Sequence, residues 1–458
     1  MQQIYCEQAL LPSGWASSVT LDISNEGTIS AVREQSTMPD SAQRKGTVIP
    51  ALASTHSHAF QRAMAGLCEQ LLNPEDTFWT WRETMYRFAN AINPDDLQAI
   101  AAQLYVEMLK AGFAQVGEFH YVHHQPGGQP YANIAQMADS IVNAAELSGI
   151  GVTLLPVLYA TAGFDAAPLS EQQSRFGNSE AQYLDLHAQI QKRCGAASNT
   201  RCGAAMHSLR AVPPDLLLSA TDELRRQNPE APIHIHISEQ MAEVTACEAV
   251  RGARPVQWLA DNLDLNVTWC LVHATHIDDA EIGLITNSGA SVSLCPTTEA
   301  NLGDGLFPLQ KFLRSGGKFS VGSDSNVSVS PVEELRLLEY GQRLNRQIRN
   351  VAADESTPST GEALLQAASN GGASALGQAA AGLSVGARAD LLVLDTEHPL
   401  LCGSPLKFRI DSWLFAGNTN AVSDVMSAGV WQIKAGKHEN EEAIANEFRR
   451  VQTKLRNS

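Results

Sequence analysis

The 458-residue chain lacks several features that mark membrane, secreted or nucleic-acid-binding proteins. It has no uninterrupted run of about 20 apolar residues, the length that a membrane-spanning helix needs, and its first 15 residues have neither a basic region nor an apolar run with a cleavage site. Basic residues are scarce, because 32 lysines and arginines stand against 49 acidic residues and give a net charge of −17. This charge disfavours nonspecific binding to nucleic acid or anionic membrane. We therefore expect a cytoplasmic protein with no nucleic-acid or membrane partner.

The cysteines also lack the spacing of a metal or redox motif. The chain has 8 of them, with no CxxC pair, and it is too long to need disulfide bonds to hold its fold. We expect most of them to be reduced core residues. They are Cys6, Cys68, Cys194, Cys202, Cys247, Cys270, Cys295 and Cys402.

The chain does contain a long alternation of strand-like and helix-like segments between two short β-rich ends. Apolar residues recur at three- and four-residue intervals, which is typical of helices, in residues 95–110, 134–147, 215–226, 241–259 and 332–346. The strand-like runs are Val48–Thr55, Ala114–His120, Gly151–Tyr159, Cys202–Val212, Ile233–Ile237, Val267–Val272, Ala290–Cys295 and Lys318–Gly322. Eight such runs predict an α/β fold, a (β/α)8 barrel of the TIM type, over residues 50–378. Residues 1–49 and 379–458 are predicted to form together a small β-sandwich domain with a terminal helix.

Two histidines follow the first strand-like run in the sequence Thr55-His56-Ser57-His58. Residues i and i+2 of a strand point to the same side, so His56 and His58 can share one metal ion. Alone, this pattern also fits two polar residues at a strand end.

Three further strand-like runs end in polar groups of the same kind. Ile233–Ile237 delivers His236 with Glu239 just beyond it, WCLVH ends in His273, and Asp324 follows Lys318–Gly322. Each alone has an ordinary interpretation, a core histidine or a helix-capping aspartate. Together they favour a site, because the C-terminal ends of barrel strands converge on one mouth. His234, one pleat deeper than His236, is interpreted as a core residue or as a support for the ligands.

This set of residues resembles the amidohydrolase superfamily over nearly the whole chain. The resemblance implies a metal-dependent hydrolase with His56, His58, His236 and Asp324 as metal ligands and Glu239, His273 and Asp324 as catalytic residues. No lysine occurs between Lys192 and Lys311, whereas binuclear members bridge two metals with a lysine. We therefore expect one Zn²⁺ per subunit, which would activate a water molecule for attack.

Several longer motifs resemble the formimidoylglutamate deiminase family, which acts in histidine degradation. They are HAFQRAMAG at 58–66, FWTWR at 78–82, EFHYVHH at 118–124, CPTTEANLGD at 295–304 and SVSPVEELR at 328–336. The resemblance implies hydrolysis of N-formimidoyl-L-glutamate to N-formyl-L-glutamate and ammonia. It also implies that the carboxylates of this dicarboxylate substrate bind to Gln61, Arg82, Tyr121, His207 and Arg210. Arginine suits that role because its planar guanidinium binds carboxylates through two hydrogen bonds.

Other interpretations remain open at this point. Met206, Asn326 and Gln115 depart from the pattern of the deiminase family. A nucleobase deaminase or a chlorohydrolase-like amidohydrolase would carry the same metal ligands, and a noncatalytic barrel would retain only the fold. The resemblance and the frequency of dimers among soluble enzymes also favour a homodimer.

Overall fold

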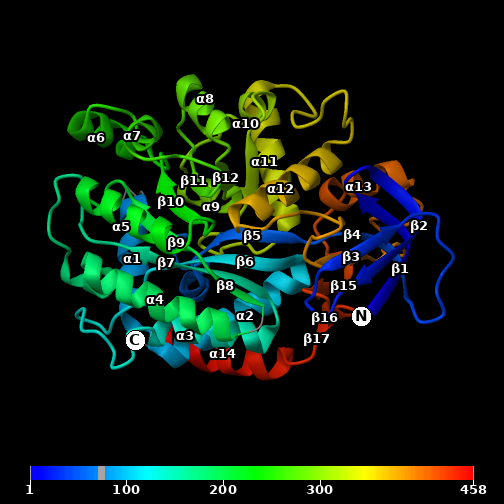
Figure 1. The fold of residues 1–458 in the computed structure, drawn as a ribbon, viewed down its shortest axis with the longest axis horizontal. Coiled ribbons are helices and arrows are strands. Elements are labelled where there is room, and N and C mark those ends of the chain that lie inside the picture. The colour runs from blue at the N-terminus through cyan, green and yellow to red at the C-terminus, as the bar shows by residue number, and fades with distance from the viewer. Residues whose placement is uncertain (1, 71–77, 198, 457–458) are drawn as a thin grey trace.

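Eight parallel strands close into a barrel at the centre of the protein (Figure 1). The structure is a computed structural model that describes residues 2–70, 78–197 and 199–456, so residues 1 and 457–458 of the predicted β segments lie outside the described residues. The sheet order is β6-β5-β13-β12-β11-β10-β9-β7, and pairing of β6 with β7 closes it. The strands are β5 (Leu52–Ser57), β6 (Phe113–His120), β7 (Gly151–Leu158), β9 (Ala204–Ser208), β10 (Ile233–Ile237), β11 (Trp269–His273), β12 (Ser291–Leu294) and β13 (Lys318–Val321). The predicted (β/α)8 barrel is confirmed.

Helices surround the barrel and connect its strands (Figure 1). They are η1 (Ala59–Met64), α1 (Phe78–Ala91), α2 (Pro94–Ala111), α3 (Gln136–Ser148), η2 (Glu171–Phe176), α4 (Glu180–Ala196), α5 (Pro214–Gln227), α6 (Met241–Arg251), α7 (Pro255–Asn262), α8 (Asp279–Ser288), α9 (Pro296–Leu302), α10 (Leu309–Arg314), α11 (Pro331–Arg346) and α12 (Thr360–Ala375). A short strand, β8 (Thr200–Cys202), pairs with β7 outside the barrel.

The expectation of one helix over 241–259 is wrong. The structure has α6 and α7 there, because Gly252 ends α6 in the left-handed conformation with φ of 74°. Pro255 then starts α7 at a position where its missing N–H costs nothing. The spacing of apolar residues stays helical across this break, so the sequence pattern gave no sign of the boundary between α6 and α7.

The N- and C-terminal segments form a separate eight-stranded sheet, as predicted. Its order is β17-β16-β15-β14-β4-β1-β2-β3, in which β4 joins strands from both ends of the chain. The strands are β1 (Gln2–Leu11), β2 (Gly14–Ile23), β3 (Ile29–Arg33), β4 (Gln43–Pro50), β14 (Leu391–Leu394), β15 (Val422–Ser427), β16 (Val430–Lys434) and β17 (Lys437–His438). The short helices η3 (Leu406–Phe408) and α13 (Arg409–Phe415) connect β14 to β15.

The two sheets meet inside one strand-like run, Val48–Thr55. The first part of that run belongs to β4 and the second to β5, with Ala51 between them. Val48 packs in the core of the small sheet, whereas the neighbouring Ile49 packs in the core of the barrel. This alternation shows that β4 contributes one face to each core. It also fixes where β5 begins, and the first two predicted ligands lie at the other end of that strand.

The chain ends in α14 (Glu441–Arg456), which packs against α2 on the outside of the barrel (Figure 1). Lys454 near its end pairs with the buried Asp96 at the start of α2, with 2.5 Å between Nζ and Oδ2. Among the described residues, no helix combines the length and apolar character needed to cross a membrane.

Candidate metal and catalytic site

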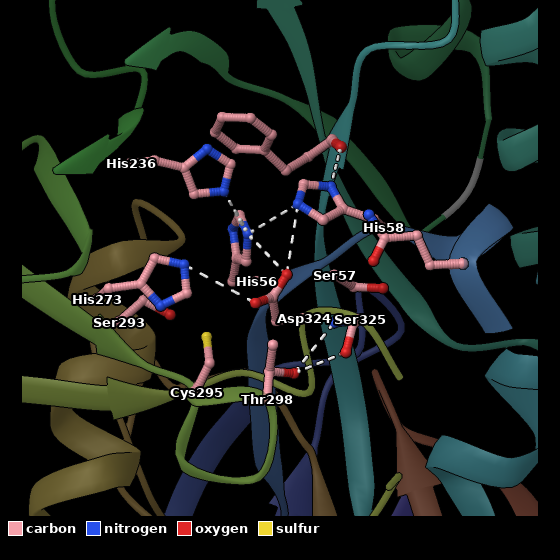
Figure 2. A network of polar contacts seen from close by, with 12 residues as sticks. His56, Ser57, His58, His236, His273, Ser293, Cys295, Thr298, Asp324 and Ser325 are labelled. Carbon is pink, nitrogen blue, oxygen red and sulfur yellow. Dashed lines mark hydrogen bonds and ion pairs between the residues drawn. The ribbon is translucent and has the colours of Figure 1, made fainter. Parts of the chain in front are cut away.

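The structure brings the predicted metal ligands together at one mouth of the barrel. His56 and His58 lie at the end of β5, His236 at the end of β10, and Asp324 just after β13 (Figure 2). His56 Nε2 lies 3.2 Å from His58 Nε2 and 3.0 Å from His236 Nε2. Asp324 Oδ1 lies 3.5 Å from His56 Nε2 and 3.4 Å from His58 Nε2. Four donor atoms from three strands therefore converge on one point.

Hydrogen bonds behind the histidines set which ring nitrogen faces that point. His58 Nδ1 lies 2.9 Å from the carbonyl oxygen of Phe119, and His236 Nδ1 lies 3.1 Å from that of His207. A carbonyl oxygen only accepts, so each Nδ1 carries the proton and each Nε2 presents a lone pair. Lone pairs that face one another repel unless a cation lies between them.

The donor set fits a tetrahedral Zn²⁺. Ligand atoms about 2.0–2.2 Å from such an ion lie roughly 3.3–3.5 Å apart, close to the separations of 3.0 to 3.5 Å found here. Burial lowers the pKa of His56 to about 3 and also lowers the pKa of His58 and His236. Neutral imidazoles are the form that binds metal.

Backbone strain is concentrated at the same strand ends. Ser238, His273, Ala274, Asp324 and Asn326 have φ values of 52°, 68°, 50°, 45° and 58°. Residues other than glycine rarely adopt this left-handed region, and each instance costs about 1–3 kcal/mol. The fold holds these side chains at the cost of local strain, which is typical of functional sites.

Glu239 and His273 lie beside the metal-binding cluster. Glu239 Oε1 and Asp324 Oδ2 each lie 3.8 Å from His273 Nε2. Burial raises the pKa of Glu239, although the nearby His273 counteracts it. Burial alone would lower the pKa of His273, but Glu239, Glu299 and Asp324 together raise it to about 10. The site therefore holds a carboxyl group suited to taking up and releasing a proton.

The five predicted substrate-binding residues line one cavity with this cluster. Gln61 Nε2 donates to the Tyr121 hydroxyl at 3.0 Å, and Arg82 Nη2 donates to the Tyr86 hydroxyl. The rings of His207 and Tyr121 lie 5.8 Å apart. The full lining is His58, Gln61, Trp81, Arg82, Met85, Tyr86, Tyr121, Tyr159, Phe176, His207, Arg210, His236, Glu239, His273 and Asp324.

The sequence analysis missed the apolar and aromatic wall of this cavity. Trp81, Met85 and Tyr86 come from α1, Phe176 from the end of η2, and Tyr159 follows β7. Only the helical spacing of Trp81, Met85 and Tyr86, which places them on one face of α1 beside Arg82, signalled this role in the sequence. Tyr159 and Phe176 lie in connections whose sequence has no such periodicity.

Four residues noted in the sequence prove to be structural. His234 is fully buried, with Nε2 donating to the Ala375 carbonyl at 2.8 Å, so it is a core residue that braces α12. Asn326 Nδ2 donates to the carbonyls of His58, at 3.2 Å, and Asp324, at 2.9 Å. Gln115 donates to Asp390 beneath the barrel at 2.5 Å, so its departure from the deiminase pattern lies outside the site. Met206 is buried within β9.

Comparisons with known proteins agree with the fold. The model of the Amidohydrolase family matches residues 47–431. Formimidoylglutamate deiminase of Pseudomonas aeruginosa is 48% identical over 451 residues, covering 98% of this chain and 99% of that protein. A 5-methylthioadenosine/S-adenosylhomocysteine deaminase of Natronomonas pharaonis is 28% identical over 362 residues, and this match covers 78% of this chain and 75% of that deaminase. The crystal structure of an amidohydrolase from Brucella melitensis has a TM-score of 0.94 and 44% identity, covering 99% of this chain and 100% of that chain.

Proposed function

This chain belongs to the amidohydrolase family, and from that premise we propose that it hydrolyses N-formimidoyl-L-glutamate to N-formyl-L-glutamate and ammonia. The observation that carries the proposal is that Arg82 and Arg210 line the same cavity as Glu239 and the metal-binding cluster. In a chain with a net charge of −17, two arginines that line one cavity favour an anionic substrate. The deiminase of 48% identity supplies the substrate's identity.

We propose one Zn²⁺ per chain, held by His56, His58, His236 and Asp324. The histidine-rich donor set and its spacing support zinc, and the absence of lysine between Lys192 and Lys311 argues against a lysine-bridged pair of ions. A bound Zn²⁺ supplies a Lewis acid that lowers the pKa of a water molecule to about 7.

Glu239 moves the proton in the proposed reaction. Its carboxylate accepts a proton from the attacking water as the oxygen bonds to the formimidoyl carbon. It donates that proton to the imino nitrogen, which gives the tetrahedral adduct. The hydroxyl proton of the adduct then passes through Glu239 to the same nitrogen, and the C–N bond breaks as the C=O bond forms, which releases ammonia. Burial, which raises the pKa of Glu239, helps it to hold the proton between these two steps.

His273 lies beside Glu239 in the same cavity. Its Nε2 lies near both Glu239 and Asp324, where it can donate to the oxygen that gains charge in the tetrahedral adduct. Asp324 lies between His56, His58 and His273 and so links the proposed metal ligands to this donor.

The substrate carboxylates bind across the cavity in this proposal. Arg82 and Arg210 form charge-assisted hydrogen bonds to them, while Gln61, Tyr121 and His207 provide neutral partners. Burial and the nearby Arg210 keep the pKa of His207 well below its usual value, so His207 binds as a neutral group.

A substrate panel tests the proposal. Ammonia release would be measured with metal-analysed protein on N-formimidoyl-L-glutamate, N-formimidoyl-L-aspartate, guanine and cytosine. We expect release from the glutamate derivative at least about 100-fold faster than from any other compound, because both charged contacts, to Arg82 and to Arg210, must be satisfied. Activity only on a nucleobase would contradict the substrate, and no activity in zinc-replete protein would favour a noncatalytic barrel.

A further inference from the structure

The CPTTEANLGD motif at 295–304 has no part in the proposed metal or substrate contacts, yet its first turn lies against the site. Glu299 on α9 is 5% exposed, and its Oε1 lies 3.3 Å from His273 Nδ1. The same oxygen accepts the backbone N–H of Cys295 at 2.8 Å. Two N–H groups thus meet one carboxylate oxygen on the side of His273 that faces away from the cavity.

The rest of the first turn of α9 ties this carboxylate to the strand end that carries Asp324. Thr298 shares a hydrogen bond of 3.0 Å with the Ser325 hydroxyl (Figure 2) and donates to the Ser323 carbonyl at 3.3 Å. Thr297 Oγ1 and N both donate to the buried Glu334 of α11, at 2.6 and 2.9 Å. The helix is therefore a brace between β11 and the loop after β13.

We propose that Glu299 is a positioning residue that orients the His273 ring: Nδ1–H donates to the Glu299 carboxylate, so that Nε2–H faces the reacting atoms, as its proposed role as a donor requires. A carboxylate has no N–H to offer and accepts only, so the hydrogen bond assigns the proton to Nδ1. Without this acceptor the ring could rotate about its side-chain bonds or exchange its two nitrogens. The inference rests on the proposed function, because it assigns a purpose to the orientation of His273 in that reaction.

The strained backbone of His273 makes such an anchor necessary. Its φ of 68° and the φ of 50° at Ala274 leave the strand end without regular β geometry. The ring is 1% exposed, and its Nε2 is 3.8 Å from both nearby carboxylate oxygens, beyond hydrogen-bond distance. The Glu299 contact is thus the hydrogen bond that holds the ring in the structure. His273, Cys295 and Glu299 could also group around a cation, but Glu299 Oε1 already accepts two N–H groups.

Two substitutions at Glu299 separate orientation from simple packing. Glu299→Gln keeps an oxygen that can accept from both N–H groups, whereas Glu299→Leu removes the acceptor at similar volume. Glu334→Gln and Glu334→Leu are the matched controls, because Glu334 is also a buried carboxylate that accepts from the first turn of α9 but does not touch His273. All four proteins would be compared with wild type for zinc content, melting temperature, kcat and KM.

We expect Glu299→Leu to lower kcat by about 10–100-fold with KM for N-formimidoyl-L-glutamate and zinc content unchanged. Glu299→Gln should recover most of that loss, and the Glu334 variants should change the melting temperature more than kcat. A Glu299→Leu protein that keeps kcat within twofold of wild type contradicts the proposal. So does a loss of kcat that Glu334→Leu reproduces at equal melting temperature.

Imidazole ¹⁵N NMR gives a readout that does not depend on the substrate. The His273 signals would be assigned with a His273→Asn protein, and wild type should show a protonated Nδ1 that Glu299→Leu loses or broadens. If wild type lacks the proposed activity but shows this signal, the substrate proposal fails while the role of Glu299 stands. An Nδ1 that carries no proton in wild type overturns the proposal.

Discussion

Glu239 is the residue whose removal should separate metal binding from chemistry. Its carboxylate lies beside the metal-binding cluster but is not one of the proposed ligands, so Glu239→Gln should keep about one zinc per chain while kcat falls roughly 10²–10⁴-fold. Metal analysis and steady-state kinetics on the same preparation measure both quantities. A Glu239→Gln protein with wild-type turnover would remove the basis of the mechanism.

Arg82 and Arg210 are expected to control substrate affinity. A hydrogen bond to a charged group contributes about 1.5–3 kcal/mol, so Arg82→Met or Arg210→Met should raise KM by roughly 10–150-fold. Lysine at either position should recover only part of the affinity, because it lacks the planar guanidinium. Arg201, which lies outside this cavity, provides the control Arg201→Met. An unchanged KM in both cavity variants would contradict the carboxylate assignment.

At the scale of single residues, sequence patterns predicted the metal ligands more completely than they predicted the residues of the cavity wall. The period of two residues in a strand places His56 beside His58, and barrel geometry brings His236, His273 and Asp324 to the same mouth. Tyr159 and Phe176 line the cavity from connections that carry no periodic signal. Glu299 could not be predicted for a different reason, since its role depends on a hydrogen bond between α9 and the end of β11.

Among the elements, η2 anchors α1, the helix that carries Arg82. Arg175 in η2 is fully buried and donates to the carbonyls of Ala89 in α1 and Ile92 just after it, as well as to His124. Arg175 reaches these carbonyls from two atoms, Nε and Nη1, whereas lysine has a single side-chain nitrogen. Arg175→Lys should therefore lower stability by about 1–3 kcal/mol and, by misplacing α1, raise KM by up to about 10²-fold.

Kinetics and urea unfolding of the Arg175→Lys protein check that expectation. Arg193→Lys is a suitable control, because Arg193 forms half-exposed ion pairs on α4, away from α1. If KM stays at the wild-type value while stability falls, Arg175 supports the fold without positioning the substrate-binding helix.

Element boundaries were the least predictable feature, for identifiable physical reasons. The run Val48–Thr55 is continuous in hydrophobicity, yet it serves two sheets, because alternate residues of β4 face different cores. The segment 241–259 keeps its apolar period across Gly252 and Pro255, so the break shows only in the residues that favour it. Packing and strand pairing in the folded protein, and not local hydrophobicity, determine where these strands and helices end.

For the whole molecule, buried neutral histidines predict loss of stability in acid. Burial lowers the pKa of His120 to about 3 and that of His234 to about 4, from an ordinary value of 6.5. Between pH 6.5 and about 4 the unfolded chain takes up protons that the folded chain does not, so the free energy of unfolding falls as pH falls. Each such group contributes up to about 1.4 kcal/mol per pH unit.

Urea unfolding at pH values from 7.5 to 4.5 tests this expectation. Burial raises the pKa of Glu118 to about 8 and that of Glu243 to about 7, which acts in the opposite direction, so the diagnostic quantity is the effect of one histidine. Between pH 6.5 and 4.5, His234→Gln should reduce the slope of the free energy of unfolding against pH by the equivalent of about one proton. A slope that His234→Gln leaves unchanged would show that His234 is already protonated in the folded protein at these pH values.

The alternation of strands and helices was sufficient to predict the closed barrel, because parallel strands joined by helices admit few arrangements. The separate sheet followed from β-rich runs at both ends of the chain. The homodimer stays a prediction, since one chain cannot reveal its partner surface, and sedimentation equilibrium would check it.

The identity of the product tests the central claim most directly. The protein would be incubated with N-formimidoyl-L-glutamate in H₂¹⁸O, and the products would be identified by mass spectrometry and ammonia assay. The account predicts one ammonia per substrate and N-formyl-L-glutamate that carries one ¹⁸O in its formyl group. Formamide with free glutamate would mean that the other C–N bond breaks, and it would contradict the proposed reaction.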